Sequence, residues 1–199
     1  MESFRTESVP ELPGEEKSKV RRALLDVLET LIIAVVLFVG INAVSARIRV
    51  DSFSMEPTLQ KGNFVIVNKL AYQFGSPQRG DIVVFRYPPN PIEQYIKRII
   101  GLPGEIVRIN AGQVQINGEI LTEPYLLDST VRGGEWQVPA DSYFVLGDNR
   151  NNSSDSRVWG MVPADKLIGK ALVIYWPPDR WNVLGNEFVL AAETANIGE

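Results

Sequence analysis

Hydrophobic and polar positions divide the chain into a polar N-terminal tail, one long apolar segment and a series of short apolar runs. Residues 1–16 are polar and lack apolar periodicity, which is typical of a disordered segment. A basic cluster ends this tail, and the segment from Leu24 to Ala46 is then mostly apolar. We therefore predict a disordered cytoplasmic tail with its basic cluster over residues 1–22 and a transmembrane helix over residues 23–46.

The apolar segment is best explained as a membrane anchor. Its uncharged part, Thr30 to Ala46, is at the short end of the length needed to cross a bilayer. A buried core helix and a cleavable signal peptide are the alternatives, but the segment has no polar face between Leu31 and Gly40. More basic residues precede the segment than follow it closely, so the positive-inside rule predicts a cytoplasmic N-terminus and an extracytoplasmic domain.

Residues 47–199 have the pattern of a mainly β domain. Short runs rich in Val, Ile and Phe alternate with Gly and Pro, at 64–70, 81–87, 95–100, 105–110, 113–121, 143–146 and 167–176. Asn117-Gly118 interrupts one of these runs and predicts a two-residue hairpin turn. No long helical pattern follows Ala46. The predicted fold class is mainly β, with antiparallel sheets, on one N-terminal transmembrane helix.

The composition excludes several kinds of chemistry. The chain contains no histidine and no cysteine, which excludes a Ser-His-Asp triad, a cysteine nucleophile, a His-ligated zinc and a disulfide framework. The net charge of −4 gives no basic footprint for nucleic acid. We expect no metal, no cofactor and no nucleic-acid partner.

Ser54, in the sequence Ser54-Met55-Glu56-Pro57-Thr58, is a candidate nucleophile. Pro57 fixes its own φ and restricts Glu56 to extended conformations, so the backbone beside the serine is held in place. An ordinary tight turn needs the same restriction. If Ser54 is a nucleophile, its base must be a lysine, a carboxylate or an N-terminal amine, and a Ser-Lys dyad is a known variant of the triad.

Lys97 is the candidate base. It lies in the middle of the apolar run 95–100, where strand alternation places it on one face with Tyr95 and Ile99. A lysine on an apolar face is disfavoured unless it is paired or functional. The alternatives are an edge-strand lysine that discourages aggregation and a side chain that extends to solvent.

The motifs of the chain resemble those of bacterial type I signal peptidases (leader peptidases), which are Ser-Lys dyad serine proteases. The matching segments come in the family's order and are Ser54 to Thr58, Gly80 to Phe85, Lys97 to Gly104 and Gly147 to Arg157. With the anchor, the resemblance extends over roughly residues 21–176. It implies that Ser54 is the acylating nucleophile and Lys97 the general base.

The resemblance also implies supporting roles around the dyad. Ser52 matches the serine whose hydroxyl forms the oxyanion hole with the Ser54 backbone N–H, and Ser153 matches the serine that orients the lysine. Asp155 and Arg157 match a structural ion pair beside the site. Larger members of the family carry additional β lobes, so we expect a small second lobe here, at about 105–140.

The implied activity is that of a membrane-bound serine endopeptidase. It removes N-terminal signal peptides from exported preproteins after an Ala-x-Ala-like site, so its partners are preproteins and the lipid bilayer. We expect Ile48, Val50, Tyr95 and Ile96 to bind the substrate peptide in an extended form. The location is the cell membrane, with an internal membrane such as a thylakoid as the alternative. Trp176 and Trp181 could rest at the membrane interface or pack in the core.

For Lys97 to act as a base near neutral pH, its pKa must fall from about 10.4 to roughly 7–8, and desolvation can lower it. Two other functions remain open. One is a self-cleaving Ser-Lys peptidase similar to the SOS-response repressors, although those carry a DNA-binding domain where this chain has its apolar segment. The other is a catalytically inactive, membrane-anchored β domain that serves as a scaffold.

Overall fold

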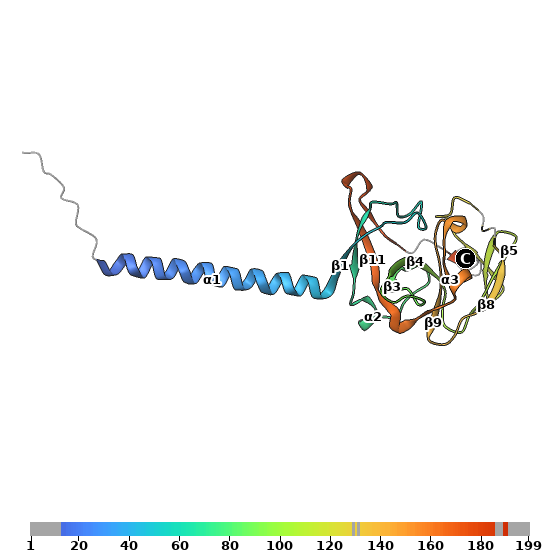
Figure 1. Ribbon diagram of the computed structural model, residues 1–199, viewed down its shortest axis with the longest axis horizontal. Coiled ribbons are helices and arrows are strands. Elements are labelled where there is room, and N and C mark those ends of the chain that lie inside the picture. The colour runs from blue at the N-terminus through green and yellow to red at the C-terminus, as the bar shows by residue number, and fades with distance from the viewer. Residues whose placement is uncertain (1–12, 129, 131, 186–188, 191–199) are drawn as a thin grey trace, which may run out of the picture. The chain divides into compact units, whose positions relative to one another are not determined.

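The computed structural model describes residues 13–128, 130, 132–185 and 189–190 of the chain, and Figure 1 shows its elements. The chain divides into two compact units, Met1–Ala43 and Val44–Glu199. Among the described residues, one long helix and two antiparallel sheets make up nearly all the regular structure. This confirms the predicted fold class.

The described part of the first unit consists of helix α1, Pro13–Val44, whose last residue already belongs to the second unit. Its apolar part, Lys19–Val44, is 26 residues long, which exceeds the roughly 20 residues that a bilayer requires. The helix begins at Pro13, earlier than the expected start at residue 23, and its first turns are rich in the helix formers Glu, Lys and Arg. Residues 1–12 of the expected tail lie outside the described residues.

The larger sheet of the second unit has the strand order β1-β2-β11-β3-β4-β9-β10, with β12 paired to β11. The strands are β1 (Ser45–Arg49), β2 (Phe64–Asn68), β3 (Ile82–Arg86), β4 (Gln94–Gly101), β9 (Ser142–Leu146), β10 (Val162–Pro163), β11 (Leu167–Trp176) and β12 (Asn182–Val183). The anchor was expected to reach Ala46, but β1 begins at Ser45 because the backbone there pairs with β2, Ser45 opposite Asn68.

The smaller sheet has the order β13-β7-β6-β5-β8. Its strands are β5 (Ile106–Asn110), β6 (Gln113–Ile116), β7 (Glu119–Thr122), β8 (Gly134–Gln137) and β13 (Val189–Leu190). Asn117 and Gly118 join β6 to β7 with φ angles of 53° and 91°, as a two-residue hairpin turn requires. Strand β8 lies outside the runs that the sequence pattern predicted as strands, and its pairing with β5 supplies the hydrogen bonds that make it a strand.

Short helices connect the strands. They are α2 (Ala71–Phe74), α3 (Ser156–Trp159) and the 3₁₀ turns at Arg150–Asn152, Ala164–Lys166 and Pro178–Arg180. The last turn follows β11 and lies between the two tryptophans whose environment the sequence left open: Trp176 ends β11 and Trp181 follows the turn. Trp176 is 53% exposed and Trp181 is 73% exposed, so neither is packed in the core.

Strand β4 lies in the centre of the hydrophobic core. Every side chain from Ile96 to Ile100 is buried, on both faces of the strand. Ile96 packs in the cluster that contains Met55 and Leu59, whereas Ile99 packs in a separate cluster with Tyr95 at its margin. Because both faces of β4 are covered, a charged side chain within this strand is removed from water.

Candidate active site

Ser54 lies in the loop that joins β1 to β2, and backbone hydrogen bonds hold this loop at its base. The Val50 N–H donates to the Asn63 carbonyl and the Gly62 N–H donates to the Val50 carbonyl, both at 2.8 Å. The side chains of Met55 and Leu59 are fully buried on either side of the Glu56–Pro57 bond, which is cis. The loop is therefore anchored by packing as well as by its proline, and the serine has a fixed position.

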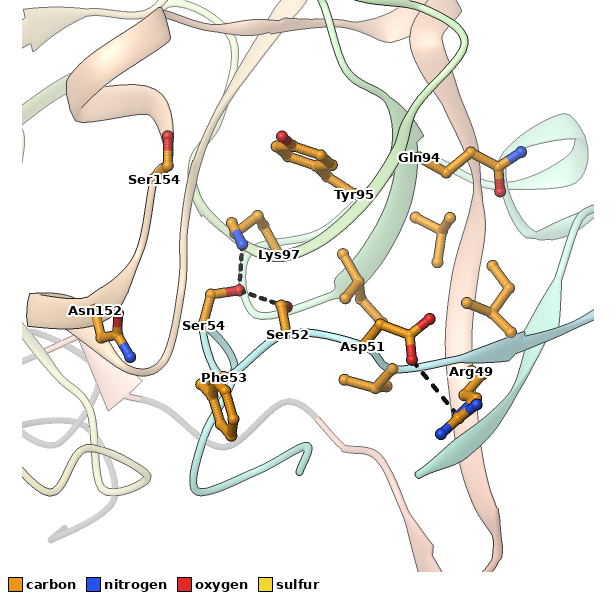
Figure 2. A pocket seen from close by; sticks show the side chains of 14 residues that line it. Arg49, Asp51, Ser52, Phe53, Ser54, Gln94, Tyr95, Lys97, Asn152 and Ser154 are labelled. Atoms are coloured by element: carbon orange, nitrogen blue, oxygen red, sulfur yellow. Dashed lines mark hydrogen bonds and ion pairs between the residues drawn. The ribbon is translucent and has the colours of Figure 1, made fainter. Parts of the chain in front are cut away.

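Lys97 lies in the middle of β4, and its side chain contacts this loop. Its Nζ lies 2.5 Å from the Oγ of Ser54 and is hydrogen-bonded to it. Lys97 is 4% exposed and Ser54 is 7% exposed. Figure 2 shows the two side chains pointing toward each other, with Ser52 beside them. Two residues that lie 43 positions apart in the sequence thus form one buried pair.

The environment of Lys97 lowers the pKa of its amine. Burial lowers this pKa to about 8, because the ammonium form loses its hydration while the neutral amine does not. The carboxylates of Asp155 and Asp148 act in the opposite direction. Each is held by an arginine: Asp155 pairs with Arg157 and Asp148 pairs with Arg98, with closest distances of 2.7 Å. Desolvation therefore decides the direction of the shift.

Hydrogen-bond donors lie beside the Ser54 hydroxyl. The Oγ of Ser52 is 3.3 Å from the Oγ of Ser54. Within the described part of the chain, no acceptor receives the backbone N–H of Ser54. A hydroxyl and a free N–H next to a nucleophile are the kinds of donor that stabilise a developing oxyanion.

The segment after β9 passes directly behind the serine. Gly147 approaches the carbonyl oxygen of Ser54 and the hydroxyl of Ser153 so closely that a Cβ at this position would overlap both. The Ser153 hydroxyl is buried and has no hydrogen-bond partner among the described residues. Its role in orienting Lys97 therefore stays a prediction.

Asp155 and Arg157 form a buried ion pair in this segment. The carboxylate of Asp155 also accepts the backbone N–H of Gly147 at 3.1 Å. The Arg157 guanidinium donates to the carbonyl of Arg150 at 2.5 Å. The pair thus fixes the backbone on both sides of the turn that follows β9.

The structure contains two further buried ion pairs that the sequence analysis did not predict. The guanidinium of Arg98 binds both carboxylate oxygens of Asp148, at 2.9 and 2.7 Å, and stacks on the Tyr125 ring with its Cζ 3.9 Å from the ring centre. Arg150 binds Glu123, which belongs to the loop after β7. For Arg98 the only signal in the sequence was its place in an apolar strand, and Arg150 lies in a turn, where a charged residue gives no signal. Both partners are far away along the chain.

A cleft of about 520 Å³ opens over the pair. All four residues predicted to bind substrate line it, namely Ile48, Val50, Tyr95 and Ile96. Sequence reasoning missed other lining residues, which are Arg49, Asp51, Phe53, Val84, Gln94, Asn152 and Ser154. Val84 enters the cleft because β3 pairs with β4 and places it opposite Ile96. Local sequence carries no signal for that register.

The described residues include no group of three or more His, Cys, Asp or Glu side chains that could hold a metal ion. The arrangement that is present can perform acyl transfer. It contains a hydroxyl, an amine of lowered pKa within hydrogen-bond distance, and donors for an oxyanion.

Comparisons with known proteins agree on one family. The model of the family "Signal peptidase, peptidase S26" matches residues 24–176. The chain is 43% identical to signal peptidase I of Leptolyngbya laminosa over 185 residues, covering 88% of this chain and 91% of that protein. It is 42% identical over 187 residues to the probable signal peptidase I-2 of Synechocystis, covering 90% and 85%.

A chloroplast protein is also similar to the chain. Thylakoidal processing peptidase 1 of Arabidopsis thaliana is 37% identical over 142 residues, which cover 66% of this chain and 42% of that protein. The family match covers most of the apolar helix, the loop that carries Ser54 and the strand that carries Lys97. The chain therefore belongs to the signal peptidase I family, the serine endopeptidases that remove signal peptides.

Proposed function

We propose that this signal peptidase works by a Ser-Lys dyad, with Ser54 as the acylating nucleophile and Lys97 as the general base. The observation that carries this proposal is the buried hydrogen bond of 2.5 Å between the Lys97 Nζ and the Ser54 Oγ. A histidine cannot take the role of the base because the chain contains none. The lowered pKa of Lys97, about 8, gives a useful fraction of neutral amine near neutral pH.

In the acylation step, the neutral amine of Lys97 accepts the proton of the Ser54 hydroxyl. The Ser54 oxygen attacks the scissile carbonyl, and the resulting oxyanion is stabilised by the Ser54 N–H and the Ser52 hydroxyl. Each such donor contributes a few kcal/mol, about 3 for a well-placed one. The Lys97 ammonium then protonates the leaving amine, which becomes the new N-terminus of the mature protein.

In the deacylation step, the neutral Lys97 amine removes a proton from water, which attacks the acyl-enzyme ester. The bond between the Ser54 oxygen and the acyl carbon then breaks, the Lys97 ammonium returns its proton to the Ser54 oxygen, and the signal peptide leaves with a free carboxylate. Ser153 is proposed to hold the lysine in position during both steps, because its buried hydroxyl lacks another partner in the described part of the chain. The ion pair between Asp155 and Arg157 acts indirectly, by fixing the backbone behind Ser54.

The substrates are proposed to be exported preproteins with an Ala-x-Ala-like site. The cleft wall formed by Ile48, Val50, Val84 and Ile96 is apolar, and these residues belong to one hydrophobic cluster or pack against it. A shallow apolar wall accommodates small side chains at positions −1 and −3 of an extended peptide.

The proposed location is the cell membrane, with the N-terminus in the cytoplasm and the catalytic domain outside. The apolar helix and the excess of basic residues before it support this orientation. A thylakoid membrane is the alternative, and the similarity to a thylakoidal processing peptidase keeps it open. Protease protection of each end of the chain in sealed membrane vesicles tests the orientation.

The function is tested by cleavage of a preprotein carrying an Ala-x-Ala site, with the full chain in detergent. Ser54→Ala and Lys97→Ala are each expected to abolish cleavage, while the controls Ser76→Ala and Lys166→Ala, at positions that do not line the cleft, retain it. Circular dichroism checks that all variants fold. Cleavage that survives Lys97→Ala would mean a different base, and cleavage that survives Ser54→Ala would mean a different nucleophile.

The same experiment separates the two other functions considered. A self-cleaving peptidase would shorten its own chain in a manner dependent on Ser54, which mass spectrometry of the purified protein detects. A catalytically inactive scaffold would cleave no preprotein at all.

A further inference from the structure

The two ends of the cleft differ in chemistry. Figure 2 shows Asn152 and Ser154 on one side of the Ser54–Lys97 pair, and Gln94 and Arg49 on the other. The aliphatic lining residues lie with the second group: Ile48 and Val50 flank Arg49 along the chain, and Ile96 in β4 is paired with Val84 in β3. We call the first side the polar end and the second the apolar end.

An extended substrate peptide lies along the cleft in one direction, with its scissile bond at the Ser54–Lys97 pair. If the small side chains before the scissile bond occupy the apolar end, the residues after that bond lie in the polar end. An extended chain advances about 3.3 Å per residue, so the first three residues of the mature protein span about 10 Å beyond Ser54. These residues therefore lie next to the side chains that border the polar end.

Phe53 lies at this end of the cleft, and Lys61, which does not itself line the cleft, lies beside Phe53. Phe53 directly precedes the nucleophile, lines the cleft and is 48% exposed. The Nζ of Lys61 lies over its ring, 5.2 Å from the ring centre. A cation is thus held beside the residue that adjoins Ser54.

The positive charge at the polar end is not neutralised by a neighbouring carboxylate. Among the described residues, Lys61 has no carboxylate within 4.0 Å, and this includes Glu56, the one acidic residue of the loop 52–61. At the apolar end, by contrast, the Arg49 guanidinium is 3.5 Å from the Asp51 carboxylate. The two ends therefore differ in net charge as well as in polarity.

We infer that the polar end, framed by Phe53, Asn152 and Ser154, receives the first residues of the mature protein, and that Lys61 selects there for an acidic side chain over a basic one. The inference rests on the proposed function, since it needs a scissile bond at Ser54. Asn152 and Ser154 are neutral, so they contact the peptide without adding to the charge preference. Lys61 acts by long-range attraction and is a specificity-determining residue.

The test uses preprotein substrates that are identical except at positions +1 to +3, where they carry either Glu or Lys among alanines. The wild-type chain is expected to give a kcat/KM ratio, Glu over Lys, of about three to five in dilute buffer, falling toward one as NaCl is raised. Lys61→Glu is expected to reverse the ratio, Lys61→Ala to bring it near one, and Lys61→Arg to keep it. Lys166→Glu, a charge reversal outside the cleft, is the control and should leave the ratio unchanged.

The ratio compares two substrates on one enzyme, so a loss of folded protein cancels. Equal cleavage of the Glu and Lys substrates by the wild type, or an unchanged ratio in Lys61→Glu, would overturn the inference while the proposed function stands. A preference that persists in high salt would point to a steric origin and would also overturn it. Cleavage of neither substrate by any variant would instead remove the proposed function and the inference together.

Discussion

The backbone N–H of Asn149 donates to the carbonyl oxygen of Ser54 at 3.0 Å. Its side-chain amide donates to the carbonyl of Phe53 at 3.2 Å, so one residue of the segment after β9 holds two consecutive carbonyls of the nucleophile loop. The same segment carries Asp148 and Ser153. The position of Ser54 is therefore tied to the strand that also flanks Lys97, since β9 pairs with β4.

Removing the hydrogen bond of the Asn149 side chain should lower kcat more than it changes KM. Asn149→Ala keeps the backbone bond but frees the Phe53 carbonyl, and we expect kcat to fall about two- to tenfold with KM nearly unchanged. Steady-state kinetics measures both constants. Asn90→Ala, in the exposed turn between β3 and β4, is the control. A change in KM alone would mean that Asn149 contacts substrate and does not position the serine.

The rate should depend on pH through Lys97. Its pKa is lowered to about 8, so below that pH most of the amine is protonated and cannot accept the Ser54 proton. We expect kcat/KM to rise about tenfold per pH unit below this pKa and to level off above it. A profile that stays flat between about pH 6 and pH 9 would contradict a lysine base. The substrate should carry no group that titrates in this range.

The same burial costs stability, and replacing Lys97 should recover it. A lysine whose pKa is lower in the folded state destabilises the fold fully below its folded pKa, about 8, and not at all above its unfolded pKa, 10.5. We expect inactive Lys97→Met to have a free energy of unfolding about 1–3 kcal/mol above the wild type at pH 7.

Urea unfolding at several pH values measures how the stability gained in Lys97→Met changes with pH, and so checks the sign of this dependence. The gain of Lys97→Met should shrink as the pH rises from about 8 toward 10.5, because the wild-type amine becomes neutral in both states. Ser54→Ala is the matched control, since it removes the same hydrogen bond without removing the ammonium. A gain that is independent of pH would show that packing, and not desolvation of the charge, is responsible.

Breaking a buried ion pair should be far more damaging than breaking an exposed one. Asp148→Asn leaves the guanidinium of Arg98, which is almost fully buried, without its counter-charge, and we expect a loss of about 3–5 kcal/mol in the free energy of unfolding. The side chains of Arg108 and Glu135 are 52% and 51% exposed, so Glu135→Gln should cost less than about 1 kcal/mol. Similar losses in both variants would contradict the burial argument.

Widening the apolar end of the cleft should relax substrate choice. Ile48 is only partly buried, so Ile48→Ala enlarges the wall with less damage to the core than Ile96→Ala would cause. We expect cleavage of sites with Val or Leu at −1 or −3, measured by mass spectrometry of the products. Specificity that is unchanged in this variant would remove Ile48 from the substrate-binding surface.

The sequence by itself determined the class of the fold and restricted which residue types can serve as the base for Ser54. The apolar segment before Ser45 predicted a helix because nothing polar interrupts it between Leu31 and Gly40. The short Val- and Ile-rich runs predicted antiparallel strands because they are bounded by turn residues. The absence of histidine restricted the base of Ser54 to a few residue types. Both inferences rest on local chemistry, which a linear sequence contains.

Tertiary structure decided what depends on pairing between distant strands. The burial of both faces of β4 lowers the pKa of Lys97, and it arises only when β3, β9 and the loop of Met55 close around that strand. The partners of Arg98 and Arg150 are likewise distant in sequence, at Asp148 and Glu123. Strands β1 and β8 have weak intrinsic patterns and form because neighbouring strands supply their hydrogen bonds.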